Sequence, residues 1–225
     1  MIKRDTAGQK YKHNIFIVDD HPIVRKGLTQ LINQENDLIV CGEAESANSA
    51  LEILKKLKPD LAIVDISLQG VDGIELIKTM KIRHSSLPVL VVSMHDESVF
   101  AERALRAGAR GYIMKQEAIE MMMEAIRRVL KGDLYISGRV SENIVKRFID
   151  GKTEISSSPI EALSDRELEV FQLIGQGYGT SLIAKELHLS VKTVESYRAN
   201  IKEKLKLKNA AELMKHAVHW VDSRQ

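Results

Sequence analysis

Residues 15–20 read Ile15-Phe16-Ile17-Val18-Asp19-Asp20, four apolar residues followed directly by two carboxylates. A short run that is apolar throughout is typical of a parallel strand covered by helices on both faces. Four more such runs follow along the chain, and helical periodicity separates each run from the next. The predicted strands are residues 15–18, 38–41, 61–64, 89–92 and 111–114, and the predicted helices are residues 22–32, 47–57, 73–82, 98–107 and 118–130.

Five strand–helix units in one stretch predict an α/β domain with a doubly wound parallel sheet and right-handed crossovers. After Gly132 the alternation stops. Residues 141–150 predict a helix with Ser141 as its N-cap, and the Gly, Ser and Pro residues that follow indicate a flexible linker. The predicted organisation is a flexible tail (1–12), the α/β domain (13–131), a linker (132–160) and an all-α domain (161–225).

The last 65 residues show helical periodicity only, as expected of a small bundle of short helices. The predicted helices are residues 165–176, 180–187, 191–205 and 210–221, and their predicted N-caps are Ser164, Thr180, Ser190 and Asn209.

Composition excludes several classes of protein. The chain has 33 Lys+Arg, 31 Asp+Glu and 44% hydrophobic residues, which is ordinary for a folded globular protein. No apolar run approaches the roughly 18 residues of a membrane helix, and no apolar segment of a signal peptide follows the basic residues near the N-terminus. The single cysteine, Cys41, cannot form an internal disulfide. We therefore expect a cytoplasmic protein without a membrane partner.

Positive charge is concentrated in one stretch of the chain. Residues 13–131 carry 15 basic and 17 acidic side chains, whereas residues 192–208 carry six basic and two acidic ones. A local excess of cations on an otherwise balanced chain indicates a polyanionic partner.

Five chemically active side chains follow the predicted strands. Asp19 and Asp20 follow the first strand, Asp65 the third, Ser93 the fourth and Lys115 the fifth. The carboxyl ends of parallel strands meet at one edge of the sheet, where α/β folds bind ligands. Neighbouring carboxylates repel one another unless a cation lies between them, and Mg²⁺ prefers carboxylate and water oxygens. In this arrangement Asp65 is the candidate nucleophile, while Lys115 and Ser93 would stabilise phosphoryl oxygens.

Residues 13–131 resemble the receiver domain of two-component response regulators, a flavodoxin-like fold. The resemblance rests on Asp19-Asp20-His21-Pro22, on Asp65 with Gly70-Val71-Asp72-Gly73, on Ser93, and on Gly111-Tyr112-Ile113-Met114-Lys115. It implies that Asp65 accepts a phosphoryl group from the phosphohistidine of a sensor histidine kinase. Gln69 and Gln116 depart from the family, because many relatives carry Pro at these positions.

The same resemblance implies further roles. Asp20, Asp65 and the main-chain carbonyl of Ser67 would bind Mg²⁺ (for which Mn²⁺ can substitute), and Asp19 would support the metal through water. Tyr112 resembles the aromatic switch that responds when Ser93 moves toward the phosphoryl group.

Residues 163–221 resemble the LuxR-type helix-turn-helix domain of the NarL/FixJ subfamily, with Leu163–Val170, Ile183–Leu187 and Ser190–Arg198 carrying the motif. The motif places a helix-turn-helix at residues 181–200. Its second helix would enter the major groove of promoter DNA. Phosphates and bases would be approached by Lys192, Thr193, Glu195, Ser196, Arg198, Ala199 and Lys202.

The sequence therefore predicts a phosphorylation-controlled transcriptional regulator that is not an enzyme. Its expected partners are the kinase, double-stranded DNA, a second copy of the chain when phosphorylated or DNA-bound, and RNA polymerase as a further candidate. Two other classes stay open. One is a LuxR-type transcription factor that works without phosphorylation, and the other is a Mg²⁺-dependent phosphotransfer enzyme. Phosphorylation could act through dimerisation or through release of the DNA-binding domain.

Overall fold

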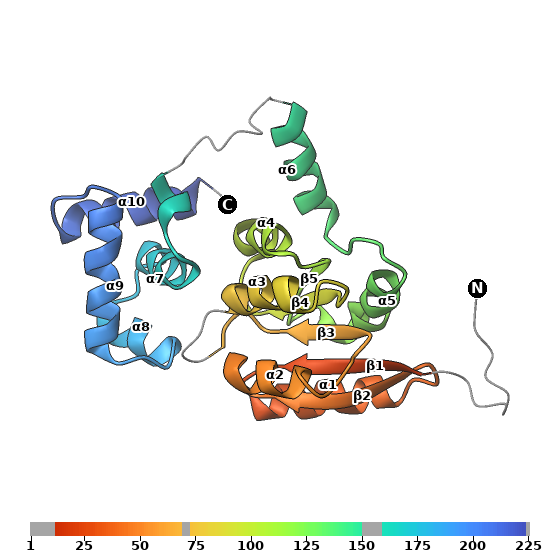
Figure 1. Ribbon diagram of the computed structural model, residues 1–225. Coiled ribbons are helices and arrows are strands. Elements are labelled where there is room, and N and C mark those ends of the chain that lie inside the picture. The colour runs from red at the N-terminus through yellow and green to blue at the C-terminus, as the bar shows by residue number, and fades with distance from the viewer. Residues whose placement is uncertain (1–11, 69–72, 150–158, 224–225) are drawn as a thin grey trace, which may run out of the picture. The chain divides into compact units, whose positions relative to one another are not determined.

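The computed structural model describes residues 12–68, 73–149 and 159–223 (Figure 1). The chain divides between Arg147 and Phe148 into two compact units. None of the helices among the described residues is both long and apolar enough to cross a membrane.

The first unit is built on a parallel sheet of five strands (Figure 1). The strands are β1 (His13–Val18), β2 (Leu38–Ala44), β3 (Leu61–Val64), β4 (Val89–Ser93) and β5 (Gly111–Met114). They lie in the order β2-β1-β3-β4-β5, so the direction of winding changes between β1 and β3. This is the doubly wound architecture that the sequence predicts, and its switch point is where such sheets bind ligands.

Helices cover both faces of the sheet. They are α1 (Pro22–Asn33), α2 (Ala47–Leu54), α3 (Gly73–Arg83), α4 (Glu97–Ala107) and α5 (Ala118–Leu130). Apolar residues of α1 and α5 join those of the central strands in one continuous core, and α2, α3 and α4 lie on the other face. Helix α2 ends three residues earlier than predicted, because Pro59 disfavours helical backbone just before it and the chain turns after Ile53.

The edge strand β2 differs from the prediction. All residues of β3 and β4 are buried, as expected of strands covered on both faces. On β2, Ile39 is 39% exposed and Cys41 is only half-buried. Strand β2 also runs beyond Cys41, with a shift in its pairing to β1 that leaves Cys41 without a partner in the register. An outer strand has one neighbour only, so its apolar residues are less completely covered.

After the sheet, α6 (Gly138–Ile149) begins three residues before the predicted start. Its first turn is capped by Ser137, whose Oγ accepts the N–H of Val140 at 3.2 Å, and the prediction of Ser141 as N-cap is therefore wrong. Val140 is buried, which explains why the helix extends back to include it.

The elements of the second unit within residues 159–223 are all helical. They are a 3-10 turn η1 (Pro159–Ala162), α7 (Asp165–Gly175), α8 (Thr180–Glu186), α9 (Val191–Lys204) and α10 (Ala210–Asp222). Ser164, Ser190 and Asn209 cap α7, α9 and α10 through their side chains, as predicted. Thr180 does not cap α8, because it is already the first helical residue and Gly179 takes the cap position.

Close packing of α7 against α10 holds this unit together. A Cβ atom at Gly175 would lie 2.4 Å from the carbonyl oxygen of Ala217, so only glycine allows the two helices to approach this closely. Phe171 and Trp220 pack nearby, with ring centroids 5.6 Å apart. On α10, Leu213 and Ala217 are buried, while Met214 is 46% exposed.

Candidate functional site

A cluster of carboxylates lies at the switch point of the sheet. Asp19 and Asp20 follow β1, and Asp65 follows the adjacent strand β3. Potential ligand atoms of Asp19, Asp20, His21 and Asp65 all lie within 4.8 Å of one another. Asp19 and Asp65 are almost fully buried, at 2% and 1% exposure. Buried carboxylates this close together require positive charge between them.

Lys115 supplies part of that charge. Its Nζ atom lies 2.7 Å from Oδ2 of Asp65 and 2.7 Å from Oδ2 of Asp19. Burial lowers the pKa of Lys115, but the negative charge of Asp65 and the hydrogen bonds to both carboxylates outweigh it, so the pKa lies above its ordinary value. The ammonium group is therefore charged, and it holds the two carboxylates from the β5 side of the cluster.

The donor set fits a hard divalent cation. One ammonium does not balance three carboxylates, and Oδ1 of Asp20 is buried at the cluster with Nδ1 of His21 2.7 Å away. A buried carboxylate oxygen of this kind is suited to Mg²⁺, which prefers oxygen ligands. Ser67 is next to the cluster, since its backbone N–H donates to Oδ1 of Asp65 at 3.0 Å.

Ser93 and Tyr112 meet at the loop after β4. Ser93 is fully buried, and its Oγ accepts the backbone N–H of His95 at 3.2 Å. The ring of Tyr112 is buried as well, and its hydroxyl donates to the carbonyl of His95 at 2.9 Å. Burial raises the pKa of the Tyr112 phenol, so it stays a neutral donor. One short loop is thus held from two sides.

Helix α9 presents the basic stretch of the chain. Ser190 caps it by accepting the N–H of Thr193 at 3.0 Å. Val194 and Ile201 are buried and fix which face points away from the domain. Of the residues predicted to contact DNA, Lys192, Glu195, Ser196 and Ala199 are exposed, and Thr193, Arg198 and Lys202 are half-buried. With α8 and the short turn before it, α9 forms the helix-turn-helix arrangement that enters a major groove.

Comparison with known protein families agrees with both sites. Residues 15–127 match the response regulator receiver domain, and residues 161–217 match the luxR family of bacterial regulatory proteins. The chain belongs to the response regulators.

For two of the similar proteins, the similarity covers nearly the whole chain. The oxygen regulatory protein NreC of Staphylococcus aureus is 38% identical over 210 residues, covering 91% of this chain and 96% of NreC. A solved structure of RcsB from Salmonella enterica serovar Typhimurium, bound to the promoter rprA with the phosphomimetic BeF3−, is 29% identical with a TM-score of 0.58, covering 92% of this chain and 98% of RcsB. A LuxR-family response regulator from Aurantimonas is 32% identical with a TM-score of 0.57, over 61% of this chain and 99% of that one.

Membership of this family makes the chain a phosphorylation-controlled transcription regulator. The receiver brings together Asp19, Asp20, Asp65 and Lys115 as the strand ends predict. Gln69 and the residues up to Asp72 lie outside the described part of the chain.

Two residues near the cluster were not given a role by the sequence. His21 places Nδ1 2.7 Å from Oδ1 of Asp20, and its backbone N–H donates to Asp19. Arg25 donates from Nη1 to the carbonyl of Asp19 at 2.5 Å and pairs with Glu43 at 3.6 Å. Arg25 lies one helical turn after His21, which is the only signal in the sequence that it points back toward this loop.

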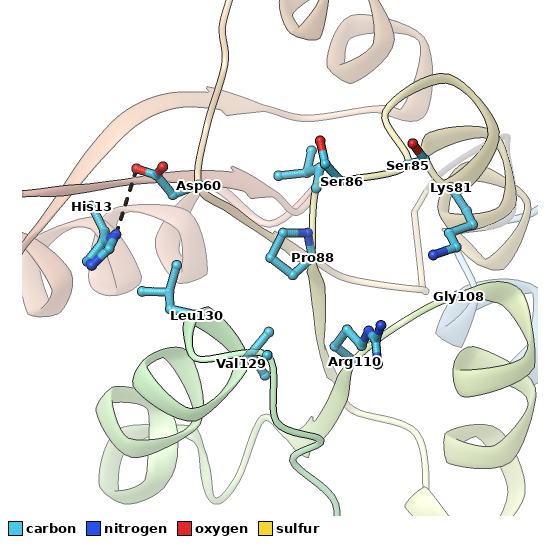
Figure 2. A pocket seen from close by; sticks show the side chains of 12 residues that line it. His13, Asp60, Lys81, Ser85, Ser86, Pro88, Gly108, Arg110, Val129 and Leu130 are labelled. Carbon is cyan, nitrogen blue, oxygen red and sulfur yellow. Dashed lines mark ion pairs between the residues drawn. The ribbon is translucent and has the colours of Figure 1, made fainter. Parts of the chain in front are cut away.

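A separate cavity of about 400 Å³ lies at the amino ends of the strands, opposite the carboxyl ends where the carboxylate cluster lies. Figure 2 shows His13 and Asp60 on one side of it and Lys81 and Arg110 on the other. It includes residues at the start of β1 and just before β5, and it shares none with the carboxylate cluster. Several helices end here, so Lys81 and Arg110 are well placed to interact with helix C-termini.

Proposed function

We propose that Asp65 accepts a phosphoryl group from the phosphohistidine of a sensor histidine kinase. A carboxylate oxygen of Asp65 would form the new bond to phosphorus while the bond to the histidine nitrogen breaks and the imidazole leaves. The observation that carries this proposal is the position of Lys115, whose ammonium already touches the nucleophile and can stabilise negative phosphoryl oxygens.

Mg²⁺ would be held by Asp20, Asp65 and the main-chain carbonyl of Ser67, with Asp19 acting through water. When bound, a divalent ion neutralises charge on the phosphoryl oxygens, and Mn²⁺ can supply the same chemistry. The crowding of the carboxylates supports this set, because ligand atoms of Asp19, Asp20 and Asp65 lie within 4.8 Å of one another.

Ser93 and Tyr112 would transmit the effect of phosphorylation at Asp65 to the loop after β4. The phosphoryl group adds about −1.5 to −2 charge, and the Ser93 hydroxyl would donate to one of its oxygens. Because Tyr112 bonds the same loop as Ser93, a movement of one hydroxyl changes the surroundings of the other.

The second unit would bind promoter DNA through α9. Lys192, Arg198 and Lys202 would contact phosphates, and Glu195 and Ser196 would reach base edges, with Thr193 and Ala199 beside them. RcsB structures include dimers bound to DNA, and we extend a homodimer on DNA to this chain. The proposed compartment is the cytoplasm, where the DNA and a kinase domain are accessible.

The test is transfer of one phosphoryl group in the presence of Mg²⁺. The full-length protein is incubated with acetyl phosphate and its intact mass is measured. We expect one added phosphoryl group on the wild type and none on Asp65→Asn. Asp60→Asn is the matched control, because Asp60 also lies beside β3 but at the opposite edge of the sheet. Equal modification of wild type and Asp65→Asn would overturn the assignment.

A further inference from the structure

The segment between α5 and α6 is bound to the edge of the receiver sheet. Strand β5 is the outer strand on this side. The N–H of Tyr135 donates to the carbonyl of Arg110 at 3.0 Å, and its carbonyl accepts the N–H of Tyr112 at 2.9 Å. The guanidinium of Arg128 lies over the Tyr135 ring, 5.5 Å from its centre. The chain that leaves the receiver therefore touches the strand that carries Tyr112.

The start of α6 is also joined to the start of α4. Ser137 Oγ donates to Oε1 of Glu97 at 2.7 Å, and Nε of Arg139 lies 3.7 Å from the same oxygen. Nη2 of Arg139 lies 3.4 Å from Oδ1 of Asp96. That oxygen also accepts the N–H of Ser98 at 2.7 Å, as the N-cap of α4. We call these four side chains, Asp96, Glu97, Ser137 and Arg139, the latch.

The latch begins directly after the loop that Ser93 and Tyr112 hold. Ser93 Oγ accepts the His95 N–H, and the His95 carbonyl accepts the Tyr112 hydroxyl. Asp96 is the next residue, and its side chain is in the latch. Any shift of the peptide groups at His95 must therefore move Asp96 and the first turn of α4. Only two residues, Met94 and His95, separate Ser93 from Asp96, which contacts Arg139 of α6.

The ion pairs of the latch are weak enough to be broken by a small structural change. Glu97 is largely buried at 12% side-chain exposure, but Arg139 and Asp96 are 59% and 47% exposed. Exposed ion pairs are weak and depend closely on geometry. A small displacement of α4 is then enough to change the fraction of molecules in which the latch is closed.

We propose that phosphorylation of Asp65 controls whether the latch is closed, and thereby whether the start of α6 stays bound to α4. This inference rests on the phosphorylation proposed above. When Ser93 turns to donate to a phosphoryl oxygen, its bond to the His95 N–H is lost and the loop shifts. Asp96 and Glu97 then move away from Arg139, and the start of α6 is released from α4. Phosphorylation thereby acts on the linker through four named side chains.

Hydrogen exchange on the full-length protein tests the latch. With Mg²⁺ and beryllofluoride, amides of residues 134–146 in the wild type should exchange roughly three- to tenfold faster, the range for loss of an exposed ion pair and a hydrogen bond. Arg139→Ala should show the faster exchange without beryllofluoride. Lys146→Ala is the matched control, because it removes an exposed cation of α6 that has no ion pair among the described residues.

Exchanging the charges of Arg139 and Glu97 tests whether the ion pair between them is responsible. Arg139→Glu should open the latch, and Arg139→Glu combined with Glu97→Arg should restore slow exchange. If Arg139→Ala exchanges like the wild type, or if beryllofluoride leaves residues 134–146 unchanged while acetyl phosphate still adds mass, the latch is wrong and Asp65 keeps its role. If the wild type gains no phosphoryl group, the proposed function itself fails.

Discussion

Lys115 lies between two buried carboxylates, with its ammonium 2.7 Å from both Asp19 and Asp65. Its charge serves the folded receiver before any phosphoryl group arrives, because it offsets the repulsion between these groups. It serves the proposed reaction again when phosphoryl oxygens develop charge beside Asp65. These two uses can be separated by experiment.

We expect Lys115→Met to phosphorylate slowly and yet keep a metal site. Removal of one preorganised charge partner from a developing oxyanion typically costs about 10²–10³-fold in rate. Rates with acetyl phosphate are followed by intact mass, and Mg²⁺ binding by calorimetry. Lys78→Met is the control, because its ion pair with Glu75 is exposed. A rate for Lys115→Met within about twofold of wild type, well below that expected loss, would contradict the role.

Lys206 adopts a left-handed backbone conformation, with φ of 55°. This region is unfavourable for residues with a Cβ atom and open to glycine. We expect Lys206→Gly to stabilise the second unit by roughly 0.5–1 kcal/mol, since relief of strain exceeds the added chain entropy. Urea unfolding monitored by the single tryptophan, Trp220, measures the change. Lys208→Gly, whose φ is not positive, should be neutral or destabilising, and equal gains for both variants would refute the explanation.

Site residues that close a strand could be predicted, because a strand end is visible in the sequence as an apolar run followed by a polar residue. Asp19, Asp65, Ser93 and Lys115 are of this kind. Arg25 could not be predicted, because its role depends on the side chain folding back from α1 onto a carbonyl of the preceding loop. The spacing of one helical turn from His21 to Arg25 does not specify such a contact.

Helix α7 depends on a reciprocal cap at its start. Ser164 Oγ accepts the N–H of Glu167 at 3.3 Å, and Glu167 accepts the N–H of Ser164 at 2.7 Å and a hydrogen bond from Lys204 at 2.6 Å. Burial raises the pKa of Glu167, but the bonds from Lys204 and Ser164 outweigh it, so its pKa lies below the ordinary value. The ionised carboxylate therefore ties α7 to α9.

The stabilising effect of Glu167 should vanish in acid. Because its folded pKa is below the unfolded value near 4.3, the contribution is complete above that pH and is lost as the pH falls through the folded pKa. We expect Glu167→Gln to cost about 1–2 kcal/mol at pH 7, with the difference from wild type shrinking below about pH 4. Trp220 fluorescence during urea unfolding gives both values. The exposed Glu203→Gln should change little, and a difference for Glu167→Gln that is constant with pH would count against this account.

The proposed DNA contacts of helix α9 are of two kinds, contacts to phosphates that position the protein and contacts to base edges. We expect Lys192→Ala to weaken binding to all duplexes alike and to reduce the salt dependence by about one counterion. Glu195→Gln should instead change the preference among duplexes. Anisotropy titrations at several salt concentrations distinguish the two outcomes. Lys215→Ala on α10 serves as the control cation, and an unchanged salt slope for Lys192→Ala would remove Lys192 from the phosphate contacts.

Element boundaries followed from sequence where periodicity or side-chain caps decide them. Strands β3 and β5 and helix α5 begin and end at the predicted residues. The start of α6 was missed because Ser137 and Ser141 are equally good caps locally, and the choice depends on burial of Val140 and on contacts of Ser137 with Glu97. Likewise β2 extends past Cys41 because it pairs with β1, which no local pattern of β2 reveals.

The two units of the chain carry separate chemistry, a carboxylate cluster in one and a basic helix in the other. Both were visible in the sequence as strand-end residues and as a local excess of cations. The proposed latch was not visible, because it depends on Arg139 reaching from α6 to the start of α4. Such contacts form only when the receiver is folded.

The central claim is that a phosphoryl group on Asp65 changes how tightly the chain binds DNA. Duplexes are first selected from a random pool by the protein loaded with Mg²⁺ and beryllofluoride, and their Kd is then measured with and without beryllofluoride. We predict a change of roughly tenfold for the wild type, within the usual range of coupling between two sites, and none for Asp65→Asn. Equal affinities for the loaded and unloaded wild type, in protein shown by mass to accept a phosphoryl group, would contradict the account.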